Sequence, residues 1–460
     1  MKRFVKISSK MLQNALGPTL WKTLRPFQRR GIAFIERKNG RVLLGDDPGL
    51  GKTRQALIWL KLHEELRTIV VCPATVKWKW KEEEADVYAP YLKTIVLSGQ
   101  TPTRISFKYN LVIINYDILK YWEKRLKEWG ANAIIADESH RLRNRDTQKF
   151  KAFTRIAKSC KHLICLTGTP VLNSPMDYYN VLKMLRPKAF SSFMYFAHRY
   201  CDAKFNGFGW DFRGSSNEAE LHKLLTKDLG IMKRRLQKEV LPELPPVTPH
   251  PIPLHITSKE MKESEEAVQA AKESGDKIIG FAAREQARQA CLMAKLPYVV
   301  EWIKDFLENK DEKLTVFGWH KIGLHTLKDK FPKNSVLVDG DVTGKKRHNE
   351  ILKFRKNKDY PLLFGNLQSI GEGIDLIECH HTLIIEFPWG PEELKQMIGR
   401  FNRMGQKHPV HVWYMFVVDS IDTKMIDMND LKKTIISRVV DGVDVDKKAL
   451  LSALLEKGEE

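Results

Sequence analysis

Several features that mark other classes of protein are missing from this chain of 460 residues. It has no run of about 18 or more apolar residues, so we expect no membrane-spanning helix and no membrane partner. The opening residues, MKRFVKISSK, lack an apolar segment behind their basic side chains, which argues against a secretory signal. These absences predict an intracellular protein, in the cytoplasm or nucleoid, or in the nucleus if the source is eukaryotic.

Cysteine is scarce, and its spacing shows neither a disulfide framework nor a zinc signature. The sequence has no CxxC pair and no Cys/His pattern with metal-ligand spacing. Scattered cysteines of this kind are typical of reduced, intracellular thiols. The six positions are Cys72, Cys160, Cys165, Cys201, Cys291 and Cys379.

Acidic residues are outnumbered, and this imbalance points to a partner. The chain has 77 lysines and arginines against 56 aspartates and glutamates, which leaves a net charge of +21. Basic residues also serve solubility, but an excess of this size commonly marks a protein that binds a polyanion. Because the charge exceeds what solubility requires, we expect nucleic acid as a partner.

Short apolar runs rich in Val, Ile and Leu recur along both halves of the chain, separated by amphipathic stretches. Consecutive apolar positions predict parallel strands that helices bury on both faces. The predicted fold class is therefore α/β, with two parallel sheets in tandem. The predicted strands are Arg41–Gly45, Thr68–Cys72, Thr94–Leu97, Leu111–Asn115, Ala133–Ala136 and His162–Leu166 in the first half, and Leu314–Phe317, Ser335–Val338, Leu362–Phe364, Thr382–Phe387 and Val410–Phe416 in the second.

Composition divides the chain further. We expect a first lobe at residues 1–240, with an aromatic-rich insertion, partly irregular and partly helical, at about 171–230. Prolines at 241–250 predict a stiff, extended linker, because proline restricts the backbone and disfavours helix. A charged helical insertion at 251–296 then leads to a second lobe at 297–460, which ends in helices.

A candidate phosphate-binding loop follows the first predicted strand. Asp46-Asp47-Pro48-Gly49-Leu50-Gly51-Lys52-Thr53 lies between that strand and a predicted helix, which is the context that a P-loop requires. Gly49 and Gly51 would let backbone amides close around phosphate oxygens. Lys52 would reach the terminal phosphates of ATP, and Thr53 would ligate Mg²⁺. The general pattern has glycine where this chain has Asp46.

Two acids end another predicted strand. Asp137 and Glu138 follow the apolar run Ile134–Ala136, and ligands bind at the carboxyl ends of such strands. Asp137 would hold Mg²⁺ through water, and Glu138 would act as general base on the attacking water. An acidic loop cap would explain the two charges, but not their presence together with Lys52. The pair therefore predicts a site that hydrolyses ATP.

These motifs and others in a fixed order resemble the Swi/Snf-type ATPases of helicase superfamily two, in particular the compact branch that includes annealing helicases. The resemblance implies two tandem RecA-like lobes and an adenine-reading motif that contains Arg25 and Gln28. It also places Asp47 in the nucleotide site, because the family's phosphate loop carries acids at its start. The motifs are Leu24–Gln28, Asp46–Thr53, Asp137–Asn144, Leu166–Pro170, Ser369–Leu376, Trp389–Pro391 and Gln396–Gln406.

The resemblance assigns roles in the second half as well. It implies that Gly373 and Asp375 belong to the nucleotide site. Arg400 and Arg403 are three residues apart, so we expect them on one face of a helix. By resemblance they reach the γ-phosphate as arginine fingers from the second lobe. The site would then be complete only when the lobes close, and this motion would drive the protein along a bound strand.

The resemblance places nucleic-acid contacts on Pro73–Trp78, Asn115-Tyr116 and Gly318–His320, and Trp78 and Trp80 could stack on bases or pack in the core. It implies an ATP-dependent translocase on double-stranded or branched DNA, acting as a monomer, with room for a protein partner that targets it. Three alternatives stay open: a superfamily-two RNA helicase, an ATP-controlled module that clamps DNA, and the motor of a restriction or defence system.

Overall fold

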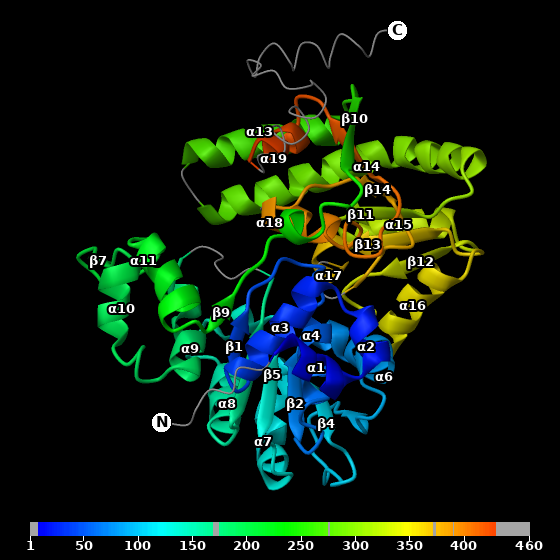
Figure 1. The fold of residues 1–460 in the computed structure, drawn as a ribbon. Helices are drawn as coiled ribbons and strands as arrows, with labels where there is room; N and C mark the ends of the chain where they lie inside the picture. Colours follow the sequence, from blue (N-terminus) through cyan, green and yellow to red (C-terminus); the bar gives the residue numbers. More distant parts are fainter. Residues whose placement is uncertain (1–7, 169–173, 275–276, 371–373, 390, 429–460) are drawn as a thin grey trace. The chain divides into compact units, whose positions relative to one another are not determined.

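The chain divides into two compact units, Met1–Pro242 and Glu243–Glu460. Each unit contains its own parallel sheet (Figure 1). Each unit also has its own hydrophobic clusters. In the part of the chain that the structure describes, no helix is long and apolar enough to cross a membrane. All six cysteines are buried and none forms a disulfide. The computed structural model describes residues 8–168, 174–274, 277–370, 374–389 and 391–428.

The first unit is built on a seven-stranded sheet in the order β3-β4-β2-β5-β6-β1-β9, with parallel pairing throughout. Ile69 and Val71 face one hydrophobic cluster, whereas Val70 and Cys72 of the same strand face another. Burial on both faces explains the continuous apolar runs, and the six predicted strands are confirmed. The strands are β1 (Arg41–Leu44), β2 (Thr68–Cys72), β3 (Thr94–Val96), β4 (Leu111–Asn115), β5 (Ala133–Ala136), β6 (His162–Leu166) and β9 (Met232–Lys233).

Helices cover both faces of this sheet. α3 and α4 contribute Ile35 and Leu57 to one cluster, whereas α7 and α8 contribute Leu126 and Phe153 to the other. The helices are α1 (Ser9–Leu16), α2 (Pro18–Thr23), α3 (Pro26–Arg37), α4 (Lys52–Leu60), α7 (Leu119–Glu128) and α8 (Gln148–Ala157), with shorter turns η1 (Ala74–Val76), α5 (Lys77–Lys79), η2 (Trp80–Ala85), α6 (Asp86–Tyr88), η3 (Tyr116–Ile118) and η4 (Ser139–Leu142).

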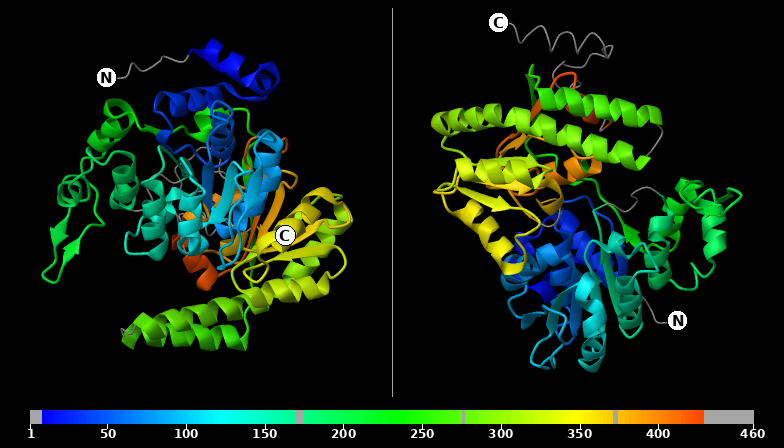
Figure 2. Two further views of the ribbon diagram at one scale, coloured as in Figure 1. Left: turned by 90° about the horizontal axis from the view of Figure 1, so that it is seen from below. Right: turned by 180° about the vertical axis from the view of Figure 1, so that it is seen from behind.

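The aromatic-rich insertion is more regular than its sequence suggests. Phe196 and Tyr200 are four residues apart and pack ring to ring with centroids 5.1 Å apart, the spacing of a helical face. A small hairpin, visible in the left view of Figure 2, extends from this group of helices. The elements are α9 (Met176–Leu185), α10 (Phe193–Tyr200), β7 (Lys204–Phe205), β8 (Trp210–Asp211), α11 (Glu218–Lys223), η5 (Leu224–Asp228) and, after β9, α12 (Gln237–Val240).

The second unit contains a six-stranded parallel sheet in the order β10-β15-β14-β11-β13-β12. The five predicted strands are confirmed, but β10 was expected as linker and helix. Its prolines 249, 251 and 253 fall on alternate positions, so their nitrogens can all face the open side of an edge strand. The strands are β10 (Val247–Leu254), β11 (Leu314–Gly318), β12 (Ser335–Val338), β13 (Leu362–Asn366), β14 (His381–Ile384) and β15 (Val410–Val417).

The expected helical insertion is part of the second unit in the structure. α14 runs through the predicted boundary at 296 and through Pro297, and it lies beside α13 (Figures 1 and 2). Lys295 on α14 is fully buried, and its Nζ donates to Asp422 Oδ2 (2.5 Å) and the Ile385 carbonyl (2.6 Å). The helices are α13 (Lys259–Ser274), α14 (Lys277–Asn309), α15 (Lys321–Lys330), α16 (Gly344–Lys356), α17 (Leu367–Ile370), α18 (Pro391–Ile398) and α19 (Ile421–Met428).

Candidate active site

The predicted phosphate loop joins β1 to α4 at the carboxyl edge of the first sheet. Gly49 and Gly51 have φ angles of +81° and +68°, which glycine adopts readily and other residues rarely do. Lys52 Nζ donates hydrogen bonds to the carbonyl oxygens of Asp46 (2.8 Å) and Asp47 (3.2 Å), so the ammonium lies against the loop. Together with the N-terminus of α4, which begins at Lys52 and Thr53, this geometry fits phosphate oxygens.

The acids at the start of the loop have structural partners, which explains the departure from glycine at position 46. Asp46 is fully buried and accepts a hydrogen bond from Arg235 Nε at 2.9 Å. Gln55 Nε2 lies 3.3 Å from Asp46 Oδ2 and completes the buried network. Asp47 Oδ1 accepts from Arg234 Nη2 at 2.7 Å. These contacts fasten the segment that follows β9 to the phosphate loop.

Asp137 and Glu138 follow β5 at the same edge of the sheet. Asp137 Oδ2 accepts a hydrogen bond from Trp80 Nε1 (2.7 Å), and the Tyr116 hydroxyl donates to the Asp137 carbonyl (2.7 Å). Glu138 has φ 48° and ψ 54°, a left-handed conformation that costs free energy outside glycine and that collects at functional sites. His140 Nδ1 lies 3.3 Å from Glu138 Oε2. Trp80 and Tyr116 therefore hold the acid pair in place.

The phosphate loop, the acid pair and the start of the predicted coupling motif meet at this edge. The pKa of Asp137 is raised to about 6, first by burial and then by the charge of Glu138, while the Trp80 N–H and the Lys52 charge act to lower it. Lys52 thus lies near enough to act on Asp137 electrostatically. Gly168 packs so closely that a Cβ there would lie 3.0 Å from Pro48 Cγ. Thr169 and Pro170 of the motif lie outside the described residues.

The predicted adenine-reading residues lie at the start of α3. Gln28 is fully buried; its Oε1 accepts from the backbone N–H of Arg25 (3.1 Å), and its Nε2 donates to the Leu50 carbonyl (3.4 Å). The side chain therefore caps α3 and joins it to the phosphate loop. Contact of Arg25 and Gln28 with a base stays a prediction.

In the second unit, two of the predicted nucleotide-site residues form a pair. Arg403 Nη1 makes an ion pair with Asp375, and Arg403 Nε donates to the Gly399 carbonyl at 2.9 Å. Arg400 and Arg403 are 8% and 7% exposed, so neither is a solvated surface charge. Gly373 lies outside the described residues.

The expectation that Arg400 and Arg403 share a helix face is wrong. α18 ends at Ile398, and the arginines lie in the turns that follow. The backbone N–H of Arg400 bonds the Met397 carbonyl at 2.9 Å, a tighter closure than an α-helix makes. The turn directs Phe401 into the core, where its ring meets Phe317 edge to face with centroids 6.1 Å apart.

The predicted nucleic-acid loop after β11 is braced by a buried carboxylate. Glu386, with a side chain 3% exposed, accepts hydrogen bonds from the backbone N–H groups of Trp319 (2.7 Å) and His320 (2.8 Å). Its other oxygen lies 2.6 Å from His320 Nδ1. Glu285 on α14 lies 3.2 Å from His320 Nε2. The loop is therefore held from the segment that follows β14 and from α14.

Several side chains expected to face nucleic acid are turned into the first unit instead. Trp80 is 2% exposed and its Nε1 donates to Asp137. Of the two roles expected for this residue, core packing is therefore confirmed and base stacking is wrong. Tyr116 is 1% exposed, and Lys77 Nζ bonds the Leu97 carbonyl at 3.0 Å. The contacts of Trp80 and Tyr116 with Asp137 could not be predicted from the sequence, because only the fold brings these two residues to the acid pair.

The fold and the site together define a P-loop α/β protein with a second parallel-sheet unit. The chain belongs to the SNF2-related family: residues 27–293 match the SNF2-related domain, and residues 294–405 match the helicase conserved C-terminal domain. The resemblance seen in the motifs is thereby confirmed.

Curated relatives cover most of this chain. The DNA annealing helicase and endonuclease ZRANB3 of Homo sapiens is 30% identical over 442 residues, which are 91% of this chain and 40% of that protein. The SWI/SNF-related matrix-associated actin-dependent regulator of chromatin subfamily A-like protein 1 of Xenopus laevis is 33% identical over 87% of this chain and 42% of its own length. The chain thus spans less than half the length of these relatives.

Among solved structures, the Sulfolobus solfataricus SWI2/SNF2 ATPase core in complex with dsDNA is 22% identical in sequence. The comparison covers 92% of this chain and 93% of that one, with a TM-score of 0.43.

Proposed function

We propose that this protein is an ATP-driven motor that couples ATP hydrolysis to movement on double-stranded or branched DNA, remodelling the DNA or protein–DNA complexes. The observation that carries the proposal is the meeting of Lys52 with Asp137 and Glu138 at one sheet edge. Membership of the SNF2-related family supports the coupling of that site to DNA. The net charge of +21 supports a polyanionic track.

The roles of the site residues follow from their chemistry. Backbone amides around Gly49 and Gly51 would cradle phosphate oxygens, and Lys52 would leave the loop carbonyls to pair with the terminal phosphates. Thr53 and Asp137 would hold Mg²⁺, which supplies charge neutralisation on the phosphates when bound. Glu138 would take the proton of the attacking water. Its strained backbone, fixed by the neighbouring hydrogen bonds, sets the direction of the carboxylate.

The proposal extends to partners and location. The relatives are described by name as a DNA annealing helicase and a regulator of chromatin, and we infer DNA as the substrate here too. We expect a monomer, with a protein partner able to supply targeting, in a compartment that holds DNA. That compartment is the cytoplasm or nucleoid, or the nucleus of a eukaryote.

The test is a comparison of ATP turnover with duplex DNA, forked DNA, single-stranded DNA and RNA of matched length. DNA should stimulate turnover more than RNA does. Binding should weaken steeply with salt, because each phosphate contact releases counterions. Equal stimulation by RNA would instead favour an RNA helicase. A protein that stays bound to DNA in the presence of ATP, but does not displace an oligonucleotide bound to that DNA, would instead favour the ATP-controlled clamp.

Glu138→Gln supplies the matched variant for this test. The amide keeps the shape of the side chain but cannot accept the proton, so ATP binding should persist while most turnover is lost. Lys52→Ala should weaken both binding and turnover. Glu128→Gln on the exposed end of α7 is the control and should behave as wild type. Near-normal turnover by Glu138→Gln would contradict the assigned role.

A further inference from the structure

At the amino-terminal edge of the second sheet, a carboxylate and two histidines come together. Glu312 lies between α14 and β11, His381 is the first residue of β14, and His380 directly precedes it. β11 and β14 are neighbouring parallel strands in which Leu314 stands opposite His381. Glu312, two residues before Leu314, therefore reaches the histidines because of the strand register. Among the described residues, this is the one group of three whose donor atoms all lie within metal-binding range.

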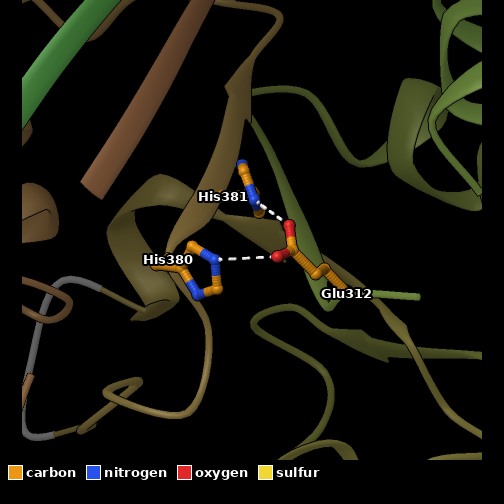
Figure 3. Close-up of side chains that lie close together, drawn as sticks. All are labelled: Glu312, His380 and His381. Atoms are coloured by element: carbon orange, nitrogen blue, oxygen red, sulfur yellow. Dashed lines mark hydrogen bonds and ion pairs between the residues drawn. The ribbon is translucent and has the colours of Figure 1, made fainter. Parts of the chain in front are cut away.

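The three side chains point toward one another (Figure 3). His380 Nε2 lies 3.4 Å from one carboxylate oxygen of Glu312, and His381 Nε2 contacts the other. All three donor atoms lie within 4.8 Å of one another. Donors around a tetrahedral Zn²⁺ ion are about 3.3 Å apart, given bonds of about 2.0–2.1 Å. Only small shifts would bring this group to that geometry.

The surroundings bury the His381 side chain and leave those of His380 and Glu312 partly exposed. The His381 side chain is 2% exposed, and its ring stacks on His411 and Trp413 with centroids 5.1 Å and 5.0 Å away. Its Nδ1 is buried with no hydrogen-bond partner, so Nε2 is the nitrogen engaged in the cluster. Glu312 is 39% exposed, which gives an ion and water a route to the site.

The donor set selects among metals. Two imidazoles and one carboxylate are a known ligand set for Zn²⁺, whereas Mg²⁺ prefers oxygen ligands alone. The ring of His408 stacks on His380 with centroids 4.8 Å apart and supports that ring, but His408 is not one of the residues whose donor atoms gather here, which leaves the fourth position to water. Lys310 lies close to His381, and its positive charge opposes cation binding. We therefore expect a moderate affinity.

We propose that Glu312, His380 and His381 bind one Zn²⁺ ion, with water as the fourth ligand. The site lies at the amino ends of the strands, opposite the carboxyl ends where ligands bind in such sheets. The ion therefore joins the connection before β11 to the start of β14 and stabilises the second unit, without taking part in ATP hydrolysis. The proposal stands independently of the function proposed above.

The experiment is isothermal titration calorimetry on the tag-free chain of 460 residues. The protein is first stripped with chelator and then titrated with Zn²⁺ and, separately, with Mg²⁺. The wild type should bind one Zn²⁺ and melt at a higher temperature with it, because an ion that binds only the folded state stabilises that state. His380→Asn and Glu312→Gln should each weaken Zn²⁺ binding by about tenfold or more and lose the thermal shift. Both positions are partly exposed, so the variants should fold.

His325→Asn is the matched control. His325 lies 2.8 Å from Asp339 in the same unit, a histidine–carboxylate pair outside the cluster. This variant should bind Zn²⁺ as wild type does. Absence of Zn²⁺ binding by the wild type, or equal loss in His325→Asn, would overturn the proposal. Binding that survives in both His380→Asn and Glu312→Gln would overturn it as well.

Discussion

At the scale of single residues, the phosphate loop is held by a buried ion pair between Arg235 and Asp46. Arg235 is 6% exposed and Asp46 is fully buried, and Gln55 Oε1 accepts a further hydrogen bond from Arg235 at 2.9 Å. Taking both charges out of water is costly, so the pair contributes little net stability by itself. Losing one partner is a different matter, because the other charge would then be buried without compensation.

We predict that Arg235→Met lowers the free energy of unfolding of the first unit by about 3–5 kcal/mol. Urea unfolding followed by circular dichroism measures the change. The double variant Asp46→Asn/Arg235→Met should recover part of the loss, since it removes the uncompensated carboxylate. Arg213→Met is the control: its pair with Asp211 is exposed on the surface, so stability should not change measurably. A similar loss in both single variants would contradict this account.

Residue types and spacing were enough to predict that Lys52, Asp137 and Glu138 lie at one sheet edge, because each follows a buried parallel strand at its carboxyl end. Their roles in hydrolysis stay predictions. The supporting residues could not be predicted in the same way. Arg235 is 189 residues from Asp46, and its role depends on β9 pairing with β1. The available signal was the unusual acid at position 46, which calls for a buried partner but does not say which one.

At the scale of elements, the apolar runs predicted the central strands because burial on both faces leaves no room for polar positions. β10 follows another rule: it is an edge strand, so prolines and partly exposed residues are tolerated. The sequence also did not show where α18 ends. The basic, glycine-containing segment after Ile398 is compatible with helix or with turn, and in the structure it forms turns that bury Phe401.

The contact between the loop after β11 and Glu386 leads to a prediction about pH. Burial acts to lower the pKa of His320, but the hydrogen bond and charge of Glu386 outweigh it, so the pKa is raised. Because the folded pKa lies above the unfolded value of about 6.5, the stabilisation is fully present below that pH. It is lost as the pH rises through the folded pKa. Glu285 and Arg288 also face His320 and act in opposite directions.

We therefore expect the stability difference between wild type and His320→Gln to be largest at pH values below about 6.5 and to shrink as the pH rises. Urea unfolding of both proteins across this range measures the difference. A difference that is constant with pH would mean that His320 does not change its charge differently in the folded and unfolded states. The loop would then be held by the backbone hydrogen bonds to Glu386 alone.

At the scale of the whole molecule, the proposed mechanism needs residues from both units. Lys52 and Glu138 belong to the first unit, and Arg400 and Arg403 belong to the second. The strand pattern predicted two sheets in tandem, and the order of the motifs along the chain predicted which of these residues belong to each sheet. The pairing of Arg403 with Asp375 within the second unit was not predicted, and it complicates any test of Arg403.

If the arginines reach the γ-phosphate, Arg400→Ala and Arg403→Ala should each cut turnover by about 10³-fold or more, the scale of a missing arginine finger. ATP affinity should fall much less, because the phosphate loop makes most of the ground-state contacts. Arg→Lys should not restore turnover, since a compact ammonium cannot reproduce the planar guanidinium. Single-turnover kinetics and equilibrium nucleotide binding separate these effects.

Asp375→Asn distinguishes an anchoring role of Arg403 from a direct one. If Arg403 serves only to hold Asp375, then Asp375→Asn and Arg403→Ala should lower turnover and melting temperature by the same amounts. If Arg403 stabilises the charge that develops on the phosphoryl group, Arg403→Ala should slow turnover far more than Asp375→Asn does at equal stability. Normal DNA-stimulated turnover in both arginine variants would contradict a site completed by the second unit, even with the phosphate loop assigned correctly.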